Sequence, residues 1–353
     1  MLTPTHAVAA ILVESGKPLI VDEIDLPPEL RFGQVLVEVH FSGICGAQVN
    51  EIEAAKGPDK FLPHLLGHEG YATVLDIGEG VSTVKVGDKV VMHWRPGSGL
   101  QGPTAQYRWG EKRVNSGWVT TFNTHAVVSE NRVTAIAPSF EPKVAPLLGC
   151  ALTTAFGVVN NDAGVRVGES VVVIGTGGVG LALIQAARMV SAYPILGIDM
   201  HAGKLDTAMN MGASHVIDSS ARQDVEGDVR AVLGGHGADV VIETTGVASV
   251  IEMAYRMTNS SGRTVCVGVP AAGNDVRIYT LPLHFDKILT GSHGGNSRPD
   301  YDIPRLVRLA QSGRVSFNSL PTTLAPLTEV NDAIARMATG EIGRQLLDMS
   351  GMT

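Results

Sequence analysis

A glycine-rich turn near the middle of the chain limits the possible folds most. The segment Val171 to Gly180 reads VVVIGTGGVG, and an apolar, helix-like stretch follows from Leu181. A strand that runs into GxGxxG and then into a helix is typical of a dinucleotide-binding unit. Gly175 would make the tight turn, Gly177 would let the backbone approach a pyrophosphate, and Gly180 would let the helix pack on the strand. The phosphates would then lie at the helix N-terminus.

A carboxylate on the next strand supports this interpretation. The segment Pro194 to Met200 reads PILGIDM and places Asp199 24 positions after Gly175, close to the roughly 20 residues expected of a ribose-binding carboxylate. Such a carboxylate accepts hydrogen bonds from ribose hydroxyls and repels a 2′-phosphate, so NAD is favoured over NADP. The alternatives are a glycine turn used only for packing and an ordinary turn residue at a strand end.

Length and charge exclude several classes of function. The 353 residues suffice for two domains, at roughly 150 residues each. The net charge of −8 argues against a nucleic-acid or anionic membrane partner. The sequence contains no run of eighteen apolar residues, and its first residues, MLTPTHAVAAILVESGKP, lack a basic region before the apolar stretch. We expect a cytoplasmic protein without a membrane segment.

The chain changes its rhythm near residue 153. Before that point, short β-like runs with glycine and proline between them predict a mostly antiparallel, barrel-like domain. These runs are AVAAILV, PLIVDEI, QVLVEVHFSGI, GYATVLDIG, DKVVMHW and FNTHAVVS. After it, strands alternate with helical stretches, which predicts a doubly wound parallel sheet. The expected strands are Ser170 to Gly175, Pro194 to Met200, His215 to Asp218, Ala238 to Thr244, Arg263 to Val269 and Lys287 to Thr290.

The end of the chain is expected to form a helix followed by a short strand-and-helix tail. Helices are expected from about Ile303 to Ser312 and from Leu327 to Thr339, and this tail is too short for a domain of its own. We therefore expect a catalytic domain made of residues 1–152 and 293–353, with a nucleotide-binding domain of residues 153–292 inserted between them.

Two cysteines and one histidine are candidate metal ligands. Cys45 lies in FSGICGAQVN, His68 and Glu69 lie in LLGHEGYATV, and Cys150 ends PLLGC. Their spacing is not that of a zinc finger, and three cysteines are too few for a disulfide framework. Any one of these residues could equally be a packed thiol or a satisfied histidine. Cys266, in the strand GRTVCVGVP, is expected to be a small core residue.

Over nearly the whole chain, the order of several motifs resembles that of the zinc-containing medium-chain alcohol dehydrogenases. These motifs are GICG, GHEG, PLLGC, GTGGVG with Asp199, and VGVP. This resemblance implies a GroES-like barrel domain and a Rossmann domain. It further implies one catalytic zinc held by Cys45, His68 and Cys150, with Glu69 beside the metal as a neighbour or exchangeable ligand. Two thiolates and one imidazole leave a fourth position open, as a catalytic zinc requires.

The resemblance also assigns roles around the cofactor NAD(H). Thr154 and Val179 would pack against the nicotinamide, and Val267 would contact its carboxamide region. Gly178 belongs to the phosphate loop. Lys204 would lie near the adenosine ribose and Arg344 near the pyrophosphate, although both could equally be solvated surface charges. Relatives form dimers or tetramers, and we expect a homodimer or homotetramer.

The sequence departs from the family at the positions that usually relay a proton. A hydroxyl residue, an Asp and a His are common there, and this chain has Ala47, Gln48 and Asn50 instead. Ala47 cannot pass a proton, whereas Gln48 can still orient the ring of His68. Either another group or water carries the proton, or turnover depends differently on pH. His93 and His293 are candidates, although a loop histidine needs no special role.

A second departure concerns the lobe after Asp88, where relatives often hold a structural zinc with four cysteines. No cysteine lies between Met92 and Asn131 in this chain, so no structural zinc is expected. The three tryptophans, Trp94, Trp109 and Trp118, lie in this lobe with several basic residues. They could simply pack the lobe. Alternatively, Arg95 follows the strand that lines the family's substrate pocket and could bind a carboxylate or phosphate.

The sequence therefore predicts a zinc-dependent alcohol dehydrogenase that transfers a hydride between NAD(H) and a small polar alcohol or carbonyl, with an anionic substrate as the sharper hypothesis. A zinc-dependent polyol or sugar dehydrogenase is the alternative within the enzymes. A protein of this fold that binds NAD(H) without turnover is the alternative of another class.

Overall fold

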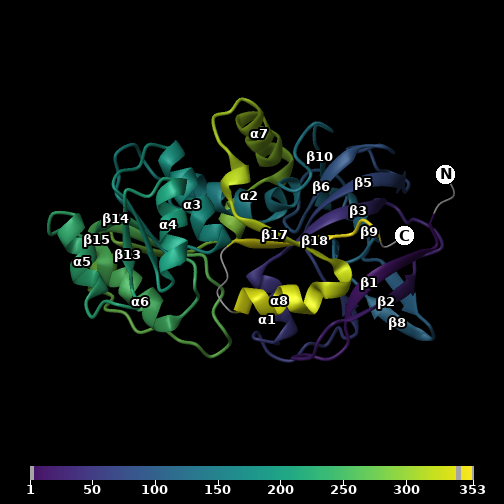
Figure 1. The fold of residues 1–353 in the computed structure, drawn as a ribbon, viewed down its shortest axis with the longest axis horizontal. Helices are drawn as coiled ribbons and strands as arrows, with labels where there is room; N and C mark the ends of the chain where they lie inside the picture. The colour runs from purple at the N-terminus through teal and green to yellow at the C-terminus, as the bar shows by residue number, and fades with distance from the viewer. Residues whose placement is uncertain (1–3, 339–342, 352–353) are drawn as a thin grey trace. The chain divides into compact units, whose positions relative to one another are not determined.

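The computed structural model describes residues 4–338 and 343–351, and its elements are labelled in Figure 1. The chain forms two compact units. The first unit contains Met1–Cys150 and Arg298–Thr353, and the second contains Ala151–Ser297. The first unit is therefore built from both ends of the chain.

The first unit is a β-structure in two parts. Five strands close into a barrel in the order β1-β2-β7-β8-β4, and a seven-stranded sheet has the order β10-β6-β5-β3-β18-β17, with β9 also paired to β3. The strands are β1 (His6–Leu12), β2 (Ile20–Asp25), β3 (Gln34–Ile44), β4 (His64–Leu65), β5 (Glu69–Ile77), β6 (Lys89–His93), β7 (Gln106–Trp109), β8 (Lys112–Asn115), β9 (His125–Ser129), β10 (Val133–Ala135), β17 (Thr322–Pro326) and β18 (Arg344–Asp348). The expected barrel-like, mostly antiparallel architecture is confirmed.

Strand β3 is central to this unit because both of its faces are buried. Val35, Val37 and Val39 pack in one core cluster, whereas Leu36 packs in the other. A nearly continuous apolar run, QVLVEV, suits a strand covered on both sides. Its last residues pair with β18 from the end of the chain, and the two strands lie side by side in Figure 1. This pairing brings the C-terminal segment to the site described below.

Several elements differ from the sequence prediction. The short strands β4, β7, β8, β10 and β18 were not predicted, because their few residues show no clear pattern of their own. The strand expected in the tail before Leu327 corresponds to β17. The helix expected from Ile303 begins four residues earlier, as α7 (Pro299–Gln311). The helix expected over Leu327 to Thr339 consists of a 3-10 turn (Leu327–Glu329) and α8 (Val330–Ala338), and Thr339 lies outside the described residues.

A buried carboxylate organises the lobe that has no cysteines. Glu130 is fully buried in a 3-10 turn after β9. Its Oε1 accepts hydrogen bonds from the backbone N–H groups of Ser82 at 2.7 Å and Thr83 at 2.8 Å, and its Oε2 accepts one from Leu100 at 2.6 Å. Burial opposes ionisation, but these donors outweigh it, so the pKa of Glu130 lies below its ordinary value. The loop that contains Ser82 and Thr83 and the loop that contains Leu100 are thus joined through one side chain.

We expect Glu130→Gln to lower the free energy of unfolding by about 2–3 kcal/mol. The amide can still accept from Ser82 and Thr83, but it turns an NH2 group toward the N–H of Leu100. Since the folded pKa is lowered, the stabilisation is fully present above the ordinary glutamate value of 4.5 and is lost as the pH falls below it. Denaturant unfolding at pH 7 and pH 4 measures both effects.

Glu79→Gln is the matched control for this prediction because Glu79 is exposed, and its loss should change stability by less than about 0.5 kcal/mol. Equal stability of the two variants at pH 7 would contradict the role assigned to Glu130. The difference between wild type and Glu130→Gln should also shrink at pH 4, since the wild-type carboxylate then begins to take up a proton.

The second unit is a six-stranded parallel sheet in the order β13-β12-β11-β14-β15-β16. Its strands are β11 (Val171–Ile174), β12 (Ile195–Asp199), β13 (His215–Asp218), β14 (Ala238–Glu243), β15 (Thr258–Cys266) and β16 (Ile288–Gly291). Its α-helices are α2 (Ala151–Gly157), α3 (Gly178–Met189), α4 (Ala202–Met211), α5 (Val225–Val232) and α6 (Ala248–Met257). The predicted doubly wound sheet is confirmed, although β15 begins at Thr258 rather than Arg263 and contains an irregularity.

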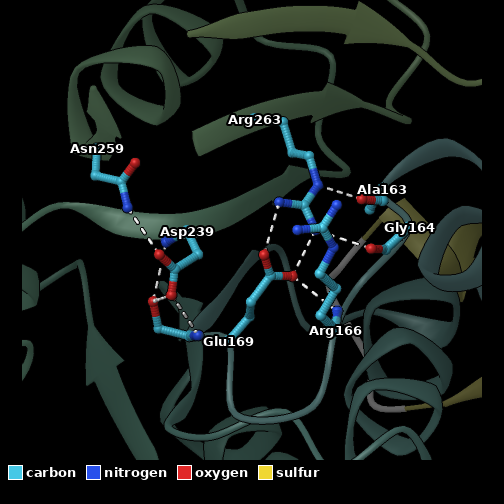
Figure 2. Close-up of polar contacts among 8 residues, drawn as sticks. Ala163, Gly164, Arg166, Glu169, Asp239, Asn259 and Arg263 are labelled. Atoms are coloured by element: carbon cyan, nitrogen blue, oxygen red, sulfur yellow. Dashed lines mark hydrogen bonds and ion pairs between the residues drawn. The ribbon is translucent and has the colours of Figure 1, made fainter. Parts of the chain in front are cut away.

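A polar network fixes the segment that leads into β11 (Figure 2). Arg263 on β15 binds Glu169 through both terminal nitrogens and also donates to the carbonyl oxygens of Ala163 and Gly164. Asp239 accepts hydrogen bonds from the N–H and hydroxyl of Ser170 at 2.8 Å. These contacts fix the start of the strand that ends in the glycine-rich turn.

Within the described part of the chain, no helix is long and apolar enough to cross a membrane.

Candidate metal centre and cofactor loop

Three segments of the first unit bring two thiols and an imidazole together. Cys45 lies between β3 and α1 (Gly46–Ile52), His68 lies between β4 and β5, and Cys150 follows a 3-10 turn, Ala145–Gly149. One ligand atom from each residue lies within 4.8 Å of the other two. Residues 23 and 82 positions apart in sequence therefore form one cluster.

The glycines that precede two of these residues allow the close approach. Gly67 has a φ of +92°, and a Cβ there would lie 2.2 Å from Thr121 Oγ1. A Cβ at Gly149 would lie 2.2 Å from the carbonyl oxygen of Met92. Any side chain at either position would displace the backbone that carries His68 or Cys150. The motifs GHEG and PLLGC thus have a steric reason for their glycines.

The atoms of this cluster suit a metal ion. The Nε2 atom of His68 is buried and has no hydrogen-bond partner among the described residues, whereas its Nδ1 lies 2.9 Å from the amide nitrogen of Gln48. The pKa of the Cys45 thiol lies well below its ordinary value, chiefly because of a hydrogen bond with Cys150. Burial raises this pKa, whereas the neighbouring His68 lowers it further. Two sulfurs and one imidazole nitrogen form the donor set of a catalytic zinc with a fourth position open.

Glu69 lies outside this ligand group and is paired with a residue from the end of the chain. Its Oε1 forms an ion pair with the guanidinium of Arg344 on β18, and both side chains are buried. Its Oε2 has no hydrogen-bond partner among the described residues. Arg344, expected near a pyrophosphate, therefore lies beside Glu69 within the first unit. Exchangeable ligation by Glu69 and phosphate contact by Arg344 remain predictions.

A second group of possible ligands, Glu51, Asp59 and His64, is less suited to a metal. One atom from each lies within 4.8 Å of the others. However, His64 Nδ1 lies 3.0 Å from the carbonyl oxygen of Leu65, and His64 Nε2 lies 2.7 Å from Asp59 Oδ2. The imidazole thus has no free nitrogen to offer a metal.

The expected relay positions are spread over α1 and β6. Ala47 and Asn50 are half-buried on α1, and the side chain of Asn50 forms no hydrogen bond with the described residues. His93 is fully buried, with Nδ1 2.8 Å from the carbonyl oxygen of Arg95 and Nε2 2.9 Å from Thr134 Oγ1. Burial lowers the pKa of His93 to about 4. A neutral ring engaged at both nitrogens is poorly placed to exchange protons. His293 is exposed, in the second unit.

Arg95 lies in a cationic and aromatic part of the first unit. Its guanidinium lies 5.7 Å from the centre of the Trp94 ring. Arg132 is only 5% exposed, stacks on Trp118 at 5.2 Å and donates to the carbonyl oxygen of Trp94. Burial, and then the charge of Arg95, lower the pKa of Arg132. Arg132 forms no ion pair with a carboxylate of the described residues. The positive charges of Arg95 and Arg132 are thus close enough to act on each other.

The glycine-rich turn of the second unit has the geometry expected from its sequence. Gly175 has a φ of +87°, and a Cβ at Gly180 would lie 1.9 Å from the carbonyl oxygen of Gly175. A Cβ at Gly177 would meet no atom within 4 Å, so the backbone is open there. Asp199 ends β12 and accepts hydrogen bonds from the N–H of Thr176 at 2.8 Å and from its hydroxyl at 3.1 Å. No sequence motif had singled out Thr176.

The other predicted cofactor residues belong to the second unit, and all but Thr154 lie near the end or start of an element. Gly178 and Val179 begin α3, Thr154 is buried in α2, and Lys204 is half-buried near the start of α4. Val267 follows β15, and its N–H donates to the carbonyl oxygen of Glu243 at 2.7 Å. The loops after β11, β12 and β15 lie at the carboxyl ends of parallel strands, where α/β sheets bind ligands.

Comparison with known proteins agrees with this geometry. Residues 31–138 match the family model "Alcohol dehydrogenase GroES-like domain", and residues 178–312 match the family model "Zinc-binding dehydrogenase". An S-(hydroxymethyl)glutathione dehydrogenase of Escherichia coli O139:H28 is 30% identical, with 96% of this chain and 98% of the relative covered. An alcohol dehydrogenase class-3 of Cereibacter sphaeroides is 29% identical, with the same coverage.

A solved structure extends the likeness to the fold. An alcohol dehydrogenase zinc-binding domain protein from Burkholderia ambifaria superimposes with a TM-score of 0.88 at 27% identity, and the match covers 97% of this chain and 98% of that protein. Nearly the whole chain is thus matched both in sequence and in structure.

Proposed function

The chain belongs to the zinc-containing medium-chain alcohol dehydrogenases, oxidoreductases that act on CH–OH groups, and from this premise we propose that it transfers a hydride between NAD(H) and a polar, anionic alcohol or its carbonyl. The family implies zinc and NAD(H) as cofactors. The observation that carries the proposal is the cluster of Cys45, His68 and Cys150, in which one buried imidazole nitrogen has no hydrogen-bond partner among the described residues.

Each residue of the site has a defined task in this proposal. Cys45, His68 and Cys150 would hold a single zinc, which as a Lewis acid polarises an oxygen of the substrate. Gln48 fixes the ring of His68. A bound nicotinamide would supply the hydride acceptor, and the proton of the alcohol would have to pass to solvent. Since Ala47 cannot carry that proton, we propose that ordered water carries it out.

For the cofactor, we propose NAD(H) bound in the second unit. The open backbone at Gly177 and the helix N-terminus at Gly178 suit a pyrophosphate. The carboxylate of Asp199, held by Thr176, suits ribose hydroxyls and opposes a 2′-phosphate. Gly175, Val179, Gly180, Thr154, Lys204 and Val267 complete the proposed cofactor site, and Arg344 would reach the pyrophosphate.

Metal analysis combined with a substrate panel tests the function. We expect about one zinc per chain and formation of NADH, followed by absorbance, from neutral and anionic alcohols. Zinc-free protein that binds NADH without turnover would instead support the non-catalytic alternative. Highest efficiency with a polyol that carries no charge would favour the polyol or sugar dehydrogenase.

The charge of the substrate is a separate prediction. Relatives are named S-(hydroxymethyl)glutathione dehydrogenases, and a glutathione adduct carries carboxylates. The neighbouring positive charges of Arg95 and Arg132 also favour an anion. We expect Arg95→Ala to lower kcat/KM for anionic substrates about 10- to 100-fold, the value of one or two charge-assisted hydrogen bonds. Neutral substrates should lose less than about threefold.

Steady-state kinetics with paired substrates of equal size, one neutral and one carrying a carboxylate, measure this difference. Arg108→Ala, which removes an exposed arginine on β7, is the control. An equal loss of efficiency for both members of a pair would remove the basis for an anionic substrate.

We also propose a cytoplasmic homodimer or, as the alternative, a homotetramer. None of Cys45, Cys150 and Cys266 forms a disulfide, as a reducing compartment favours. Strand β16 is an edge of the parallel sheet, and exposed apolar side chains gather on it and on the segment before it. These are Tyr279, Leu281, Leu283, Phe285 and Ile288. An open, apolar edge favours pairing with a second copy.

Light scattering should give the mass of a dimer, and Phe285→Asp should weaken the association of its two subunits.

A further inference from the structure

The amide of Gln48 lies between three polar groups, of which it can satisfy only certain combinations. Gln48 is on α1 and only 5% exposed. Its Oε1 accepts a hydrogen bond from the backbone N–H of Gly67. Its Nε2 lies 2.9 Å from His68 Nδ1 and 3.2 Å from Glu51 Oε2. The oxygen of the amide is thus directed to Gly67, and the NH2 group to the histidine and the glutamate.

Two of these neighbours prevent the amide from turning over. The N–H of Gly67 can only donate, and the backbone there is fixed, because φ is +92° and Thr121 fills the space beside it. Turning the amide would leave this N–H facing an NH2 group. It would also bring Oε1 against the carboxylate oxygen of Glu51. Both contacts favour the orientation in which Gln48 donates to His68.

This orientation conflicts with metal binding by His68. If Nδ1 accepts a hydrogen bond, the neutral ring carries its hydrogen on Nε2, the buried nitrogen that has no partner among the described residues. A metal requires the lone pair of Nε2, and the hydrogen must then be on Nδ1, facing the NH2 group of Gln48. The N–H at Nδ1 and the NH2 group of Gln48 are both hydrogen-bond donors, so neither would have an acceptor there. The ring is neutral in both tautomers.

We propose that Gln48 is a positioning residue that sets the metal affinity of this site and keeps it below what a carboxylate at the same position would give. A carboxylate can accept from the N–H of Gly67 with one oxygen and from His68 Nδ1–H with the other. The amide has a single oxygen, so it can accept from the N–H of Gly67 or from His68 Nδ1–H, but not from both. The inference rests on the metal-binding role proposed above for Cys45, His68 and Cys150, but not on turnover.

A charge-conserving exchange of two side chains tests the inference. The double variant Gln48→Glu with Glu51→Gln places the carboxylate beside His68 and the amide 3.2 Å away, where it can donate to the new carboxylate. Composition and net charge stay the same. Since an outer partner of a metal-binding histidine changes metal affinity by about 10- to 100-fold, we expect the double variant to bind zinc at least about tenfold more tightly than the parent.

Zinc affinity is measured on the full chain by competition with a chelator, without any activity assay. Glu51→Gln alone is the matched control, since it keeps the amide of Gln48 and should bind zinc within about threefold of the parent. Thermal unfolding of the metal-free proteins checks that all variants fold alike. Equal affinity of the parent and the double variant, or an equal gain from Glu51→Gln alone, would overturn the inference.

A second readout does not depend on affinity. In the metal-free protein labelled with ¹⁵N at histidine, the ring of His68 should carry its hydrogen on Nε2 in the parent and on Nδ1 in the double variant. A hydrogen on Nδ1 in the parent would overturn the inference even if zinc binds. Failure of every variant to bind zinc would overturn both this inference and the proposed metal site, whereas equal binding overturns the role of Gln48 alone.

Discussion

Replacing Cys45 by serine is expected to remove bound zinc and to lower kcat/KM on the order of 10³-fold, while NADH binding by the second unit is retained. Cys45 contributes one of the two sulfurs of the cluster, and its thiol has a strongly lowered pKa, so it readily supplies a thiolate. A serine hydroxyl is a poor zinc ligand, and loss of the Lewis acid costs several kcal/mol of transition-state stabilisation. Metal analysis, steady-state kinetics and NADH fluorescence titration measure the three effects.

Cys266→Ser is the control for this experiment because Cys266 lies in the second unit, where burial raises the pKa of its thiol to about 11. This variant should keep its zinc. Full zinc content in Cys45→Ser would contradict the assignment of Cys45 as a ligand. Loss of both zinc and NADH binding would show that Cys45 maintains the fold instead.

The largest effect on stability is expected from Arg344→Met. Arg344 and Glu69 form an ion pair in which the arginine side chain is 6% exposed and the glutamate side chain 0%. Removing the cation leaves a buried carboxylate without its partner, which costs about 3–5 kcal/mol of unfolding free energy. Because β18 pairs with β3, the loss should also loosen the C-terminal strand. Denaturant unfolding and hydrogen exchange of residues 344–348 measure these effects.

A double variant separates the charge effect from lost packing. Arg344→Met with Glu69→Gln removes both charges, so it should be more stable than Arg344→Met alone. Arg314→Met, at an exposed position after α7, is the control and should change stability by less than about 0.5 kcal/mol. If Arg344→Met and Arg314→Met are equally stable, the buried ion pair contributes nothing.

Local patterns determined much of the fold. The run VVVIGTGGVG specifies strand, turn and helix within ten residues, because the geometry of GxGxxG depends on neighbours along the chain. The same holds for QVLVEVHFSGI, whose predicted bounds agree with β3. Short strands such as β4 and β18 were missed, since pairing with distant segments stabilises them rather than their own composition.

The predicted metal ligands depended on a joint pattern rather than on any single residue. Cys45, His68 and Cys150 each allow a structural explanation in isolation, and only the order of several motifs singled them out. The structure brings them within 4.8 Å of one another. Glu130 and Arg132 were missed, although a run of three polar residues, Glu130 to Arg132, between two apolar strands could have drawn attention to them.

By itself, the sequence determined the family, the two kinds of sheet and the candidate ligands, because these follow from residue types at short spacings and from their order. Only the tertiary structure decided which polar groups meet. It paired Glu69 with Arg344, 275 residues away, brought two loops to Glu130, and set the amide of Gln48 between Gly67 and His68. Hydrogen bonds and ion pairs depend on direction and on distances of a few ångströms, and the packing of strands distant in sequence fixes both.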